Sequence, residues 1–98
     1  MKIQKNLNLN TNYTVGEFIG IIKLSKQRAK EFLTYYENLE KNHIGKFQTA
    51  DSLNKAYLTD ILLDLIEKKY NITPVIVNGT WCEIDTPQDL ERAEKYFN

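Results

Sequence analysis

The sequence has little of what most site chemistries need. Cys82 is its one cysteine and His43 its one histidine, so no internal disulfide can form and the chain cannot supply four Cys and His ligands to a zinc ion. A lone thiol is typical of reducing compartments, and a cytoplasmic protein is expected. The longest apolar stretches, near residues 18–22 and 61–66, fall far short of the ~20 residues that span a bilayer. No apolar signal core begins the chain, so export is not expected.

An excess of either charge is also missing. Thirteen Lys and Arg balance thirteen Asp and Glu, which gives no field that would favour nucleic acid or an anionic membrane. The chain has 98 residues, which is enough for one domain, and this domain is expected to span residues 1–98. This length excludes a two-domain enzyme with its own cofactor fold.

The expected strands come from short β-branched and aromatic runs. Alternating apolar residues in 1–14 predict one half-buried strand, and the nearly continuous apolar run 15–24 predicts a central strand. Residues 73–77 and 81–85, separated by the Asn78–Gly79 turn signal, predict a hairpin over 74–85. Gly16 and Gly20 inside the second strand indicate a bulge or a close approach by a ligand or another backbone.

Three helices are expected from apolar residues at steps of three and four. Ser25 caps the first, which runs to about Lys41. The second opens at Asp51 or Ser52 and ends at Asn71. The third begins after Thr86, with Leu90, Ala93 and Phe97 facing inward. The fold class predicted from this order is α/β, a partial mixed sheet flanked by helices.

Glu83 and Asp85 form the most informative constellation. Residues two apart on a strand project from the same face, and this strand leads directly into a helix N-terminus, which favours an anion. Magnesium prefers one or two carboxylates with water and phosphate oxygens, so the pair predicts half of a site for phosphoryl chemistry. The alternative is an ordinary capping turn at Asp85–Pro87, with Glu83 facing water.

Three segments carry a resemblance to a known family. Residues 81–90 are similar to the W-x-E-I-D-T-x-x-D-L signature near the C-terminus of the nucleotidylyltransferases. Residues 55–60 together with 16–20 resemble the branch that handles phosphocholine, phosphonate alcohols and sugar phosphates. The segments occur in the family's order and cover residues 15–97. The resemblance implies the C-terminal part of a Rossmann-like nucleotidyltransferase fold.

That resemblance also implies roles. An enzyme of this family joins a nucleoside triphosphate to a phosphorylated or phosphonylated small molecule and releases pyrophosphate, with Mg²⁺ bridging the phosphates. CTP is the favoured nucleotide, but the base is selected by the half that this chain is expected to lack. Asp85 would be a metal ligand, with Glu83 as a second or water-mediated one. The residues implied to face the acceptor are Glu17, Tyr57, Asp60 and Trp81. Aromatic rings beside carboxylates suit a cationic head group. For Tyr57 and Trp81 a place in the core remains the alternative.

The chain departs from the family where nucleotide would bind. It has no G-x-G and no G-K-[ST], and its four glycines are isolated. We therefore expect a C-terminal fragment that lacks the nucleotide-binding half, contributes no catalytic residue and is inactive alone. Its partners would be the missing half or a second copy. The alternative is a small non-enzymatic α/β module for dimerisation or protein binding. An independent small enzyme is disfavoured because His43 is expected in a solvated loop and Cys82 on the face opposite the carboxylates.

Overall fold

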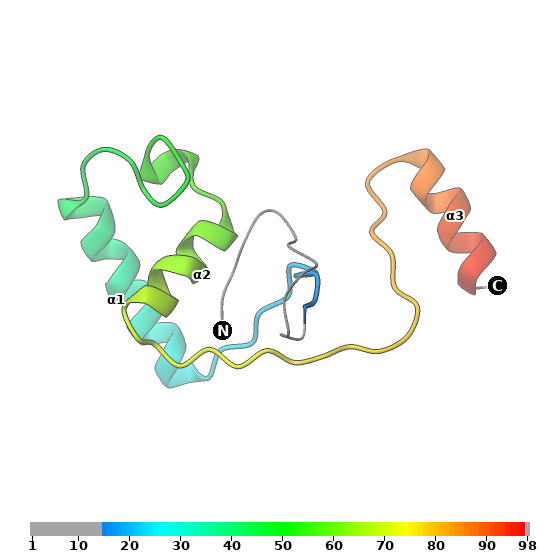
Figure 1. Ribbon diagram of the computed structural model, residues 1–98, viewed down its shortest axis with the longest axis horizontal. Helices are drawn as coiled ribbons and strands as arrows, with labels where there is room; N and C mark the ends of the chain where they lie inside the picture. The colour runs from blue at the N-terminus through cyan, green and yellow to red at the C-terminus, as the bar shows by residue number, and fades with distance from the viewer. Residues whose placement is uncertain (1–14, 98) are drawn as a thin grey trace.

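The computed structural model describes residues 15–97, which contain three α-helices and one 3-10 helix. The elements are α1 (Lys26–Asn42), η1 (Leu53–Lys55), α2 (Leu58–Glu67) and α3 (Pro87–Phe97). Helices α1 and α2 pack across each other, whereas α3 stands apart at the end of a long extended segment (Figure 1). The strand expected in residues 1–14 lies outside the described residues.

The predicted α/β fold is wrong. Between residues 15 and 97 the structure has no β-strand and no sheet; its one β-type pairing is the isolated antiparallel bridge between Phe47 and Ala50. Residues 15–24, 73–77 and 81–85 are extended chain rather than strands, and the hairpin over 74–85 does not form. The described part of the chain is therefore helical, with long irregular connections.

The physical reason lies in what a strand requires. A β-branched run favours the extended backbone locally, but its N–H and C=O groups need a neighbouring strand, and an isolated hairpin is at best marginally stable in water. Val75, Ile76 and Val77 are 86%, 69% and 61% exposed, so neither face of this run is covered. The strands predicted at residues 73–77 and 81–85 are therefore wrong.

Helix α1 agrees with the prediction at both ends. The Ser25 side-chain oxygen accepts a hydrogen bond from the Arg28 amide at 3.1 Å, which satisfies one of the free donors of the first turn. At the other end the His43 amide donates to the Leu39 carbonyl at 2.9 Å. Tyr35 and Leu39, one turn apart, are the buried residues of this helix.

Helix α2 is shorter than predicted. Residues 51–57 do not begin it: they form η1 and an extended connection, and α2 starts at Leu58. It ends at Glu67 rather than Asn71 because Lys69 adopts a left-handed conformation (φ +67°), a common way to end a helix. As predicted, Ile61 and Leu65 are buried.

One small core joins α1, α2 and the loop between them. It consists of Tyr35, Leu39, Phe47, Ile61 and Leu65. Partly buried residues around it are Phe32, Tyr36, Leu53, Ala56 and Ile72. The radius of gyration, 16.6 Å, exceeds the roughly 13 Å typical of a compact domain of this length, in keeping with an α3 that lies away from this core.

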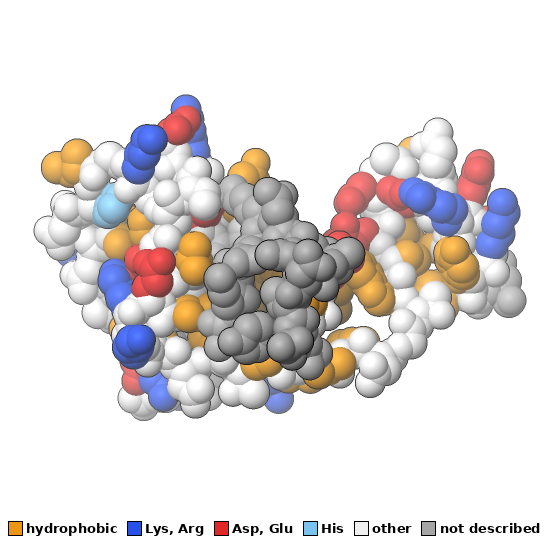
Figure 2. Space-filling model, viewed as in Figure 1, with side chains coloured by type: hydrophobic (Ala, Val, Ile, Leu, Met, Phe, Trp, Pro, Cys, Tyr) orange, Lys and Arg blue, Asp and Glu red, His pale blue; other side chains and the backbone are white. Residues whose placement is uncertain are grey.

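Helix α3 begins where the sequence predicts but buries less of itself. The Asp89 amide donates to Thr86 Oγ1 at 3.1 Å, and the Thr86 amide donates to Asp89 Oδ2 at 3.0 Å, a reciprocal capping box. Ala93 is buried as predicted. Leu90 and Phe97, which were also predicted to face inward, are 48% and 61% exposed. Figure 2 shows hydrophobic side chains on the surface around α3 as well as around α1 and α2. Within residues 15–97, no helix is long and apolar enough to cross a bilayer.

Candidate functional site

Two of the predicted acceptor residues, Tyr57 and Asp60, lie together at the start of α2. Tyr57 is the N-cap residue, with extended backbone (φ −90°, ψ 164°), and its amide donates to Asp60 Oδ2 at 2.9 Å. The Tyr57 side chain is 70% exposed. The core alternative for Tyr57 therefore does not apply in this structure, because the ring lies outside the apolar stripe of α2.

Asp60 is the most deeply buried carboxylate of the described chain, at 2% exposed. Its other oxygen, Oδ1, accepts hydrogen bonds from the Thr49 amide at 3.2 Å and from Thr49 Oγ1 at 2.6 Å. A buried carboxylate is tolerated when donors surround it in this way. Asp60 thus ties the loop before η1 to the first turn of α2.

A second buried carboxylate, Asp64, lies one turn further along α2 and was not singled out from the sequence. It accepts hydrogen bonds from the Tyr35 hydroxyl and, at 3.2 Å, from Gln48 Nε2, and pairs with Lys68 Nζ at 3.1 Å. The Lys68 ammonium also lies 5.0 Å from the centre of the Tyr35 ring. The available signal was a pair of Asp residues spaced i, i+4 within an apolar helix stripe.

The Asp64 network shifts the pKa values of both buried partners. Burial acts to raise the pKa of Asp64, but hydrogen bonds from Tyr35, Lys68 and Gln48 and the charge of Lys68 outweigh it, so the pKa is lowered. Burial raises the pKa of Tyr35 strongly, and the hydrogen bond to the Asp64 carboxylate raises it further. At neutral pH this is a neutral phenol donating to an ionised carboxylate.

The predicted metal ligands Glu83 and Asp85 lie in the extended segment before α3, and both are exposed. The Asp85 amide donates to Asp89 Oδ2 at 3.1 Å, which fixes the backbone of Asp85 against the start of α3. Asp89 also pairs with Arg92. The pKa of Asp89 is lowered, first by the hydrogen bond with Thr86 and then by the Asp85 amide.

The carboxylates of Glu83 and Asp85 are chemically suited to one half of a magnesium site. They offer hard oxygen ligands open to solvent, and Mg²⁺ commonly takes one or two carboxylates and completes its shell with water and phosphate. Across residues 15–97, no three or more His, Cys, Asp or Glu side chains are grouped so as to hold a metal ion. Any further ligands would therefore have to come from water, substrate or another part of a protein.

The remaining predicted residues are not brought to α2. Trp81 is 40% exposed and lies on the connection to α3, and Glu17 is exposed in the segment before α1. No hydrogen bond or ring contact of the described chain joins either residue to Tyr57 or Asp60. The structure thus forms two separate groups, one at the start of α2 and one at the start of α3.

His43 lies in the loop that follows α1, as the sequence predicts, but it is half-buried rather than fully solvated. Its Nε2 lies 2.8 Å from the Lys46 carbonyl oxygen. Its ring meets the Phe47 ring edge-on, with centroids 5.2 Å apart. These contacts assign His43 to the helix-end packing. Cys82 is a free, half-buried thiol.

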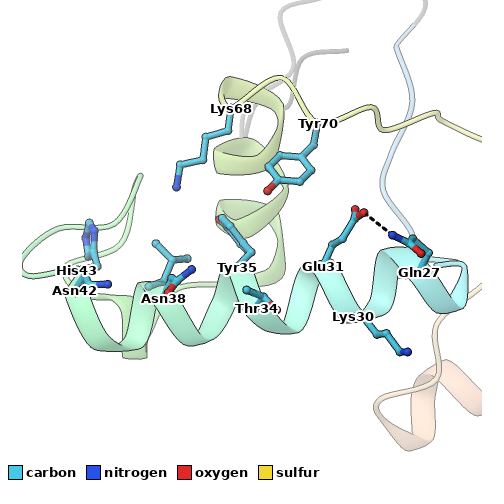
Figure 3. Close-up of a pocket in the computed structure, with 11 residues that line it drawn as sticks. Gln27, Lys30, Glu31, Thr34, Tyr35, Asn38, Asn42, His43, Lys68 and Tyr70 are labelled. Atoms are coloured by element: carbon cyan, nitrogen blue, oxygen red, sulfur yellow. Dashed lines mark hydrogen bonds between the residues drawn. The ribbon is translucent and has the colours of Figure 1, made fainter.

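An open groove runs along the exposed side of α1, with a volume of about 700 Å³. In Figure 3 α1 forms its floor, while Lys68 and Tyr70, which follow α2, reach toward Tyr35 from the opposite side. The Tyr35 and Tyr70 rings meet edge-on with centroids 6.1 Å apart. The groove is lined by Gln27, Lys30, Glu31, Thr34, Tyr35, Asn38, Leu39, Asn42, His43, Lys68 and Tyr70. None of the predicted site residues lines it.

Comparison with known proteins relates the chain to part of a nucleotidyltransferase. The similarity is to a CTP:phosphoglutamine cytidylyltransferase of Campylobacter jejuni subsp. jejuni, with 36% identity over 76 residues. The aligned part is 78% of this chain but only 29% of the cytidylyltransferase. The chain thus spans less than a third of the length of this relative. No protein-family model matches the chain, and no solved structure matches it.

Proposed function

We propose that this chain provides the acceptor-binding and metal-completing part of a magnesium-dependent cytidylyltransferase, and that transfer requires a nucleotide-binding part that it does not contain. The similarity to a cytidylyltransferase over 76 residues carries the proposal. The lack of any glycine-rich phosphate-binding motif in the sequence supports the second half of it. On this proposal the chain is inactive alone.

The reaction would transfer CMP to a phosphorylated or phosphonylated small molecule. An acceptor oxygen would form a bond to the α-phosphorus of CTP, the bond between the α-phosphorus and the bridging oxygen would break, and pyrophosphate would leave. The name of the relative contains both CTP and phosphoglutamine. The motif resemblance instead implies phosphocholine, a phosphonate or a sugar phosphate, so the acceptor has to be chosen by experiment from all four.

Roles follow for the two groups of residues. Asp85, with Glu83, would hold magnesium, which when bound neutralises phosphate charge. The extended backbone before α3, where the Asp85 amide is held by Asp89, keeps the carboxylates near the positive end of the helix dipole. Glu17, Tyr57, Asp60 and Trp81 would contact the acceptor, and the exposed Tyr57 ring is suited to a cationic head group.

The test is to assay pyrophosphate release from CTP, Mg²⁺ and each of the four acceptors. The chain alone should release none, whereas the chain mixed with a polypeptide that supplies the rest of the relative's length should release it. Asp85→Ala should then abolish turnover with folding unchanged. The matched control, Asp51→Ala, removes an exposed carboxylate in the loop before η1 and should keep the wild-type rate.

Two results would contradict the proposal. Pyrophosphate release by the chain alone would show that it binds nucleotide by itself. Wild-type turnover by Asp85→Ala in an active mixture would remove the metal role of Asp85.

A second candidate is a non-enzymatic interaction module. The observation in its favour is the amount of apolar surface left open in the described chain, notably at Val75, Ile76, Tyr96 and Phe97, which are 86%, 69%, 66% and 61% exposed. Exposed apolar surface marks a protein interface where it is contiguous. Sedimentation separates the two candidates, because a self-association module forms a stable dimer without any acceptor or CTP.

A further inference from the structure

We infer that Thr49 is the positioning residue for Tyr57, acting through the carboxylate of Asp60. This inference rests on the proposed function, because it assigns the means by which the acceptor-facing ring of Tyr57 is held. It adds a residue that no sequence motif pointed to. Thr49 lies eleven residues before Asp60, in the loop between α1 and η1.

Asp60 connects two segments through its two oxygens. Oδ1 accepts from Thr49, with the hydroxyl at 2.6 Å and the amide at 3.2 Å. Oδ2 accepts from the Tyr57 amide at 2.9 Å. The two oxygens of a planar carboxylate move together, so a donor to one of them restricts the position of the other. The Thr49 hydroxyl and amide therefore help to hold the oxygen that accepts from the Tyr57 amide.

The hydrogen bond to Asp60 supports the backbone of Tyr57. The Tyr57 side chain is 70% exposed, so most of the ring lies outside the core. Its carbonyl accepts from the amides of Asp60 at 3.0 Å and Ile61 at 3.3 Å, which with the bond from its own amide fixes the direction in which its side chain leaves the helix. Loss of one of these hydrogen bonds should leave the ring in place but in a less defined orientation. A small displacement of a group that contacts a substrate weakens binding.

Thr49 is itself anchored to the core. Phe47 and Ala50 exchange backbone hydrogen bonds at 3.0 and 2.9 Å, which closes a tight turn around Thr49, and Phe47 is 2% exposed in the core. The neighbouring Gln48 side chain donates to Asp64 at 3.2 Å and to Glu67 at 2.9 Å. The support thus runs from the core through the 47–50 turn to Thr49, Asp60 and Tyr57.

The test uses the full chain with Thr49→Val, which removes the hydroxyl and keeps the shape, and Thr49→Ser, which restores a hydroxyl. Thr34→Val is the matched control. Thr34 is an exposed residue of α1, and within residues 15–97 its side chain makes no hydrogen bond. Hydrogen exchange of the Tyr57 amide is measured first. Thr49→Val should speed it at least tenfold, while Thr49→Ser and Thr34→Val match the wild type.

The second readout is acceptor affinity. Phosphocholine, phosphoglutamine, a phosphonate and a sugar phosphate are titrated separately into the chain with Mg²⁺, and the Tyr57 ring resonances are followed. Thr49→Val should weaken whichever binds at least fivefold, and Thr49→Ser should restore the affinity. In an active mixture KM for the acceptor should rise while KM for CTP stays the same. A purely structural role would lower the unfolding midpoint and leave KM for the acceptor unchanged.

The outcomes separate the two proposals. Unchanged Tyr57 exchange in Thr49→Val overturns the positioning role, whatever the acceptors do. Faster exchange with unchanged acceptor affinity overturns it too. If none of the four acceptors shifts the Tyr57 resonances in the wild type, the acceptor-binding function fails, while faster exchange in Thr49→Val would still establish the link from Thr49 to Tyr57.

Discussion

Residues 26–70 and residues 71–97 are built on different principles. The first segment has two helices around a shared core and two buried carboxylates that bond to groups up to 29 residues away in the sequence. The second has one well-capped helix, and every hydrogen bond described within it joins residues at most four positions apart. The hydrogen bonds of the first region include long-range ones, whereas those described in the second region are local.

The difference shows what each kind of sequence signal can accomplish. Caps and helical periodicity act within a few residues, and they produced helices in both regions. The β-branched runs of the second region need hydrogen-bonding neighbours from elsewhere, and the described chain offers none. A segment can therefore carry strong strand propensity and still leave its side chains in water.

The largest contrast is expected from one apolar truncation in each region. Phe47→Ala removes a ring that is 2% exposed and should lower the free energy of unfolding by about 3–4 kcal/mol. Ile76→Ala, at 69% exposed, should change it by less than about 0.5 kcal/mol. Denaturant unfolding measures both. A large loss from Ile76→Ala would mean that the second region is packed in solution, and the comparison would fail.

A smaller effect on the first region is expected from acid. The pKa of Asp64 is lowered on folding, so below about pH 4 the unfolded chain takes up protons more readily than the folded one. The stabilisation by ionised Asp64 is present above the unfolded pKa and is lost as pH falls through the folded pKa. Tyr35→Phe removes the phenol donor and should cost about 1–2 kcal/mol near neutral pH.

Tyr35→Phe should also flatten the acid dependence, because the pKa of Asp64 is then lowered less. Unfolding free energies measured over a range of pH test this. Tyr96→Phe, which alters an exposed tyrosine of α3, is the control and should leave the curve unchanged. An equal acid slope in wild type and Tyr35→Phe would show that the phenol does not stabilise the ionised carboxylate.

The smallest change in free energy, about 1 kcal/mol each, is expected from removing the helix caps with Ser25→Ala and Thr86→Ala. The two should nevertheless differ in result. Helix α1 keeps its core contacts, whereas α3 relies on local bonds, so Thr86→Ala should fray α3 much more. Backbone carbon chemical shifts report both. Equal fraying would indicate that α3 has tertiary support comparable to that of α1.

Helix signals could be read from the sequence where they were local. Ser25 and Thr86 predicted their helices correctly because a hydroxyl and an amide three residues on are close whatever the tertiary structure. The second helix was predicted to start too early because Leu53 fits the apolar period but belongs to η1, where the chain turns to place Thr49 against Asp60. Nothing within a short window could reveal that contact.

The same limit applies to the candidate site, where the sequence relates only residues that lie close together in the chain. Tyr57 and Asp60 are three residues apart, and the structure joins them. The roles of Thr49 and Gln48 could not be found, since each acts on α2 from across the loop. The functional roles of all six predicted site residues remain predictions, because their use depends on how distant segments come together around a substrate; these residues are Glu17, Tyr57, Asp60, Trp81, Glu83 and Asp85.

The place of Trp81 has a practical consequence. It is the one tryptophan of the sequence, and it lies, 40% exposed, in the region with local contacts, while Tyr35 and Tyr70 belong to the helical pair. Indole emission will therefore register events at the C-terminal segment, such as docking of a partner, and will be largely blind to melting of the helical pair. Tyrosine emission will follow that melting, so two optical signals from the unlabelled chain can time the two processes separately.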